Sequence, residues 1–154
     1  MNASVEQIIK KLDLAPLEGE GGYFRNTYRT AHGSAIYYLV TPNDFSALHR
    51  LKHDEIFHFY SGDPVEMVQI NQQGEINKII LGSDFLNGME PQSIVAAGIW
   101  QGTRLKTGGQ WALLGTTMAP RFEYSEFELG SQAELQKQFP QHAEIINLYT
   151  RTTG

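Results

Sequence analysis

The 154-residue chain contains no cysteine, which excludes disulfide scaffolds, thiolate metal sites and cysteine nucleophiles. It also lacks any apolar run near the ~20 residues that a membrane-spanning helix needs. The amino terminus, MNASVEQIIKKLDL, has no apolar core of the kind found in signal peptides. We therefore expect a cytoplasmic protein with no membrane partner.

Basic residues are few as well. The chain has 12 Lys and Arg against 17 Asp and Glu, a formal net charge of -5. A general nucleic-acid binder needs a basic surface, so we expect no nucleic-acid partner. With 41% hydrophobic and 19% charged residues, the composition is that of a globular protein. The length is close to that of one domain, and we predict a single domain over residues 1–154.

Short apolar segments separated by turn residues fill the middle of the chain. From Tyr23 to Leu129, about ten segments rich in Val, Ile, Tyr, Phe, Trp and Thr alternate with turns such as NQQG and KTGG; the last segment is FEYSEFEL. This pattern predicts an all-β antiparallel barrel or sandwich and not an α/β fold. Helical spacing remains only at the two ends, over Ser4–Leu14 and Ser131–Tyr149, each opened by a capping box.

His49 and Glu55 are the first candidates for chemistry. Side chains two positions apart on a strand share a face. His49 therefore shares a face with Leu51, and Glu55 shares one with Phe57. Only about three residues join the two segments, so we expect them to pair as a hairpin that brings His49 and Glu55 together on one apolar face. His53 then falls in the turn.

A carboxylate on an apolar face is costly unless it is paired or hydrogen-bonded. Two interpretations remain open. One is a structural pair with no further role. The other is a functional site in which His49 and Glu55 bind a metal or a ligand, or act as an acid–base couple with shifted pKa values.

Two spaced motifs resemble those of the cupin superfamily. His49, Glu55 six positions later and Gly62 seven positions after that resemble the first cupin motif, His-x-His, three or four residues, Glu, six residues, Gly. Leu51 occupies the place of the second histidine. The segment AAGIWQ, residues 96–101, resembles the second motif, Pro-x-Gly-x-x-His, with Gln101 in place of the histidine.

Longer segments resemble one cupin-like family of unknown function, over roughly residues 14–148. The segments are GGYFRNTYR, AIYYLVTPNDFSALHRLKHDEIFHFYSGDP, AAGIWQG and GTTMAPRFEYSEFEL. The resemblance implies a cupin jelly-roll barrel, typically a homodimer, similar in fold to dTDP-sugar epimerases and sugar isomerases. It implies no established reaction.

Metal cupins bind a divalent metal through three histidines and a glutamate. Here the resemblance leaves His49 and Glu55, with Gln101 as a weak third ligand, so a divalent metal is an alternative and no cofactor is predicted. Without metal, His49 and Glu55 form an acid–base couple of the isomerase or epimerase type.

We expect the barrel to bind a small polar metabolite, sugar-like or acidic. Arg25, Tyr37, Gln101 and Thr117 are predicted to line its polar end, with Arg25 suited to a carboxylate or phosphate. Two other functions stay open, a metal-dependent enzyme and a non-catalytic interaction protein whose barrel is filled by side chains.

Overall fold

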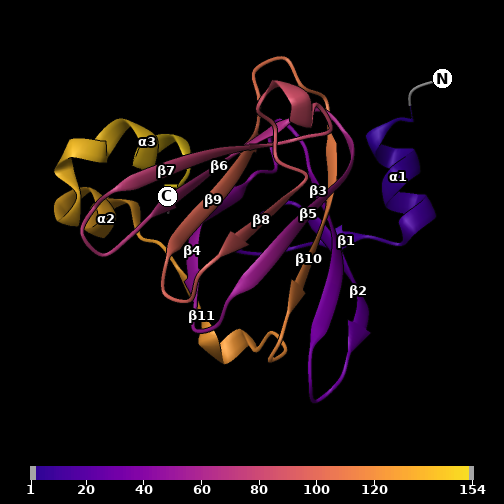
Figure 1. Cartoon of the computed structure of the whole chain (residues 1–154), viewed down its shortest axis with the longest axis horizontal. Coiled ribbons are helices and arrows are strands. Elements are labelled where there is room, and N and C mark those ends of the chain that lie inside the picture. Colours follow the sequence, from indigo (N-terminus) through magenta and orange to yellow (C-terminus); the bar gives the residue numbers. More distant parts are fainter. Residues whose placement is uncertain (1–2, 153–154) are drawn as a thin grey trace.

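The computed structural model describes residues 3–152, in which eleven strands form two antiparallel sheets that face each other (Figure 1). The six-stranded sheet has the order β1 (Ala15–Pro16), β2 (Tyr23–Arg29), β3 (Ser34–Val40), β10 (Ala112–Met118), β5 (Glu55–Gly62), β8 (Gln92–Val95). The five-stranded sheet has the order β11 (Phe127–Leu129), β4 (Ser46–Leu51), β9 (Trp100–Leu105), β6 (Val65–Ile70), β7 (Ile76–Leu81). The predicted antiparallel jelly-roll barrel is confirmed.

The helices lie at the ends of the chain and cover the outer faces of the two sheets. Helix α1 (Val5–Leu12) begins at the predicted capping box of Ser4 and Gln7 and packs on the six-stranded sheet. On the opposite side of the molecule lie α2 (Gln132–Gln138), the 3-10 turn η3 (Pro140–His142) and α3 (Ala143–Leu148) (Figure 1). These C-terminal helices pack on the outer face of the five-stranded sheet and bury Trp100 of β9. No helix within residues 3–152 has the length and apolarity to cross a membrane.

Two local predictions were wrong. The strands β4 and β5 do not form a hairpin, because β4 pairs with β9 and β11 while β5 pairs with β10 and β8. Residues 52–54 instead carry the chain from one sheet to the other. A connection of three residues can form either a hairpin within one sheet or a crossing between two sheets. The segment FEYSEFEL is not one strand, since residues 124–126 form the 3-10 turn η2 (Tyr124–Glu126) before β11 begins.

The space between the sheets is filled at one end and hollow at the other. At the filled end, Val40 of β3, Val65 and Met67 of β6, and Ala112 and Leu114 of β10 belong to one buried cluster. Further along the same strands, the inward side chains of β3 and β10 line a cavity. The hydrophobic core therefore supports the floor of a pocket inside the barrel.

Candidate ligand-binding site

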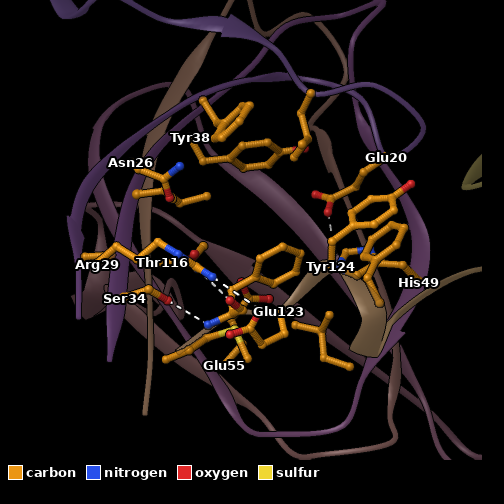
Figure 2. Close-up of a pocket in the computed structure, with 18 of the residues that line it drawn as sticks. Glu20, Asn26, Arg29, Ser34, Tyr38, His49, Glu55, Thr116, Glu123 and Tyr124 are labelled. Atoms are coloured by element: carbon orange, nitrogen blue, oxygen red, sulfur yellow. Dashed lines mark hydrogen bonds and ion pairs between the residues drawn. The ribbon is translucent and has the colours of Figure 1, made fainter. Parts of the chain in front are cut away.

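The cavity has a volume of about 360 Å³, within the range of small-molecule sites. Its inner walls are mostly apolar and aromatic, formed by Leu17, Phe24, Ile36, Tyr38, Leu51, Phe57, Met118, Phe122 and Phe127. Its more exposed rim includes Glu18, Asn26, Arg29, Glu123 and Tyr124. Figure 2 shows the polar side chains that project into this space from both sheets.

His49 is almost fully buried, and its ring is held on three sides. Its Nδ1 atom lies 2.8 Å from the carbonyl oxygen of Ala47. A carbonyl only accepts, so Nδ1 carries the hydrogen. The ring stacks on Phe127 with centroids 5.3 Å apart. The other nitrogen, Nε2, faces Oε1 of Glu20 at 3.5 Å (Figure 2).

Glu20 enters the barrel on a glycine-rich turn between β1 and β2. Gly21 and Gly22 adopt φ values of 103° and 77°, which favour glycine. A Cβ atom on Gly22 would also lie 2.7 Å from the hydroxyl of Tyr38. The hydroxyl of Ser46 donates to Oε2 of Glu20 at 2.8 Å and fixes the carboxylate beside His49.

Glu55 is the second carboxylate of the interior, and only 7% of it is exposed. Its Oε1 accepts a hydrogen bond of 3.0 Å from Nε2 of Gln101, itself buried beside His49 in the β4–β9 pairing. Burial is the largest effect and raises the pKa of Glu55 to about 6. The nearby charge of His49 opposes this shift and that of Glu20 adds to it, so the three groups are electrostatically coupled.

The sequence also matches a known protein family. Residues 6–130 match the family described as "Cupin superfamily (DUF985)". The chain belongs to this cupin family.

Two solved structures resemble this cupin over nearly its whole length. A crystal structure of a protein from Shewanella oneidensis has 31% sequence identity and a TM-score of 0.92, covering 97% of this chain and 99% of that one. A hypothetical protein from Leishmania major has 28% identity and a TM-score of 0.92, covering 97% and 100%. Oxalate decarboxylase from Bacillus subtilis shares only the fold, with 13% identity, a TM-score of 0.60, and 89% and 37% coverage. A search of curated proteins finds no significant match.

None of the four residues expected at the polar end of the pocket lines the cavity. Gln101 is buried inside the barrel against Glu55, and the other three lie outside the barrel interior. Arg25 is exposed and donates to the carbonyl oxygen of Leu12 at 3.2 Å. Tyr37 packs with the α1 cluster on the outer face of the six-stranded sheet. Thr117 lies on the same outer face, 2.9 Å from Nε2 of His58. In β3 and β10 the alternation directs their neighbours Tyr38 and Thr116 inward instead.

Arg29 lines the cavity although simple alternation along β2 would direct it elsewhere. Phe24 and Asn26 face the cavity, but a β-bulge at Thr27 inserts one residue into the pairing with β3. The bulge places Arg29 opposite Ser34, and both line the cavity. Its guanidinium donates to the carbonyl of Phe122 at 2.6 Å and pairs with Glu123 at 3.3 Å.

The side chains of residues 3–152 do not provide the set of ligands needed for the divalent metal that many cupins bind. Within residues 3–152, no three His, Asp or Glu side chains are grouped as metal ligands. Leu51 stands where a second histidine would ligate. Gln101 directs its amide N–H, and not its oxygen, at Glu55. His53 belongs to the turn after β4 and pairs with Glu126 at 3.1 Å.

Proposed function

We propose that this cupin binds a small metabolite in its barrel and that His49 and Glu55 act there as an acid–base couple, in chemistry of the isomerase or epimerase type. The observation that carries the proposal is the Glu55 carboxylate, which is buried in an apolar cavity that His49 also lines. Burial raises the pKa of Glu55 to about 6. A group with this pKa exists in both protonation states near neutral pH, as general acid–base catalysis requires.

The hydrogen bonds around the two residues support distinct roles. His49 keeps a hydrogen on Nδ1, which leaves Nε2 as the nitrogen that can exchange a proton. Glu20 faces Nε2 and would stabilise the imidazolium that results. Glu55, when protonated, is an acid held in position by Gln101. One residue can therefore take a proton while the other gives one.

The two other functions receive less support from the same residues. A metal-dependent reaction lacks a suitable set of ligands around His49. A purely structural barrel would have its interior filled by side chains, whereas this one encloses about 360 Å³. The outer face of the six-stranded sheet exposes Tyr28, Tyr60 and Ile94, and this apolar surface supports a protein contact in addition to ligand binding.

A thermal-shift screen of sugar nucleotides, sugar phosphates, organic acids, amines and divalent metals tests the proposal. A ligand at 100 times its Kd adds about 2.7 kcal/mol to the free energy of unfolding. We expect His49→Gln to retain a near-native melting temperature and to lose that ligand response. The matched control is His53→Gln, which changes a histidine outside the cavity and should respond like the wild type. Unfolding of His49→Gln with ligand affinity retained would instead assign the residue a structural role.

A further inference from the structure

The electrostatics of the cavity restrict the class of ligand. Its charged side chains comprise four carboxylates and two basic groups: Glu18, Glu20, Glu55, Glu123, Arg29 and His49. Even with His49 as imidazolium and Glu55 protonated, three negative charges face two positive ones. The side chains that line the cavity therefore carry no net positive charge, which disfavours an anionic ligand.

The basic group at the rim does not alter this balance. The guanidinium of Arg29 is bound to Glu123 and to the carbonyl oxygen of Phe122 (Figure 2). Arg25, on which the expectation of an acidic ligand depended, lies outside the cavity. A ligand carboxylate or phosphate would have to displace Glu123 to reach a guanidinium.

The Tyr38 hydroxyl and Nδ1 of His49, two hydrogen-bond donors close to Glu20 and Glu55, are already used. Tyr38 donates its hydroxyl hydrogen to the carbonyl of Gly21 at 2.5 Å, and His49 donates from Nδ1 to Ala47. Acceptors remain in excess. Each ionised carboxylate offers about four acceptor sites. The Ser46 hydroxyl occupies one on Glu20, and the Gln101 amide and the Thr116 hydroxyl occupy two on Glu55. The deep end of the cavity is thus complementary to a group that donates several hydrogen bonds.

A second and independent feature is the aromatic wall. Phe24, Tyr38, Phe57, Phe122 and Phe127 surround the same space as Glu20 and Glu55. Aromatic faces attract cations, most strongly where water is excluded. Carboxylates and aromatic rings together therefore favour a positively charged group with an apolar body.

We propose that the cavity takes a small organic amine, with its ammonium group near Glu20 and Glu55 and its apolar body against the aromatic wall. This inference rests on the proposed function, since it assigns a ligand class to the same site. The Glu20 carboxylate that faces Nε2 of His49 keeps free acceptor sites beside the single hydrogen bond from Ser46, and an ammonium group supplies hydrogens to them.

Three probes with the same ring and different head groups test the inference. They are 2-phenylethylamine, 2-phenylethanol and phenylacetate, titrated at pH 7.5 to about 10 mM while amide resonances are followed by NMR. We expect the amine to shift amides of cavity residues such as Phe57 and Thr116, with a Kd about tenfold below that of the alcohol, a difference of about 1.4 kcal/mol. Phenylacetate should be the weakest.

Variants distinguish the cavity carboxylates from surface charge. Glu55→Gln should remove the tenfold advantage of the amine and leave the alcohol unchanged, and Glu20→Gln gives the same comparison should the first variant not fold. Glu128→Gln, which alters a carboxylate paired with Arg50 outside the cavity, is the matched control. Equal affinities for the three probes, tighter binding of phenylacetate, or an amine effect abolished by Glu128→Gln would overturn the inference.

The inference and the proposed function can fail separately. If a sugar or polyol from the screen shifts the amides of Phe57 and Thr116 while the amine does not, the ligand class is wrong and the site stands. If no probe of any class perturbs the cavity amides, both are wrong.

Discussion

Replacing Glu55 with glutamine should stabilise the protein above neutral pH. The folded state raises the pKa of Glu55 from 4.5 to about 6. Because each unit is 1.36 kcal/mol, the buried carboxylate costs about 2 kcal/mol when it is ionised in the folded state. Glutamine has nearly the same shape, carries no charge and still accepts the hydrogen bond from Gln101.

The direction of the pH dependence follows from the protons bound by each state. Between pH 4.5 and about 6 the folded protein holds the proton on Glu55 while the unfolded chain has released it. The contribution of Glu55 to stability therefore falls as pH rises through this window and is fully unfavourable at pH 8. Glu55→Gln should exceed the wild type by about 2 kcal/mol at pH 8 and match it at pH 4.

Urea denaturation at these two pH values measures the difference, with equal m-values indicating the same change in exposed surface. Glu128→Gln should show no such pH-dependent gain, because its carboxylate is half-exposed. A Glu55→Gln variant less stable than the wild type at pH 8 would refute the reasoning. The carboxylate would then be a structural partner and not a group retained at a cost for function.

Two further predictions concern metal and assembly. Protein purified without chelators should carry less than one metal per chain by elemental analysis, and EDTA should not lower its melting temperature. Tightly bound stoichiometric nickel, iron, manganese or zinc would contradict the conclusion that Leu51 and Gln101 leave the site without enough metal ligands. We also expect a two-fold homodimer by light scattering at micromolar concentration, formed through the exposed Tyr28, Tyr60 and Ile94. Tyr60→Arg should then give a monomer, whereas a wild-type monomer would exclude this interface.

Much of the fold could be predicted from turn residues and apolar alternation, since these set strand boundaries locally. The hairpin turn at residues 71–74 and both helix caps follow from local residues and are present. The pairing of β4 could not be predicted in this way. A three-residue connection serves a hairpin or a corner between sheets, and contacts distant in sequence decide between them.

The site was predictable only in part. His49 and Glu55 could be found because a polar residue on an apolar strand face requires a hydrogen-bond partner or a function. Both residues line the cavity. Tyr37 and Thr117 were chosen for their chemistry, but alternation places them on the outer face. Arg29 depends on a bulge at Thr27 that leaves no clear sequence signal.

Glu20 was missed because it lies in a turn and not in a strand. The only local sign is a glutamate between glycines in GEGG, which reads equally well as an exposed loop. Its inward direction is set by the glycine conformations and by the Ser46 hydroxyl, 26 residues away in sequence.

Whether Glu55 is a buried acid in contact with a bound ligand is tested most directly by carbon-13 NMR of its side-chain carboxyl, titrated with and without 2-phenylethylamine. The free protein should show Glu55 titrating near pH 6. The bound amine should lower this pKa, because an adjacent ammonium group favours the carboxylate. A Glu55 that titrates at its ordinary value of 4.5 in both samples would contradict the assignment of the barrel interior as a ligand site.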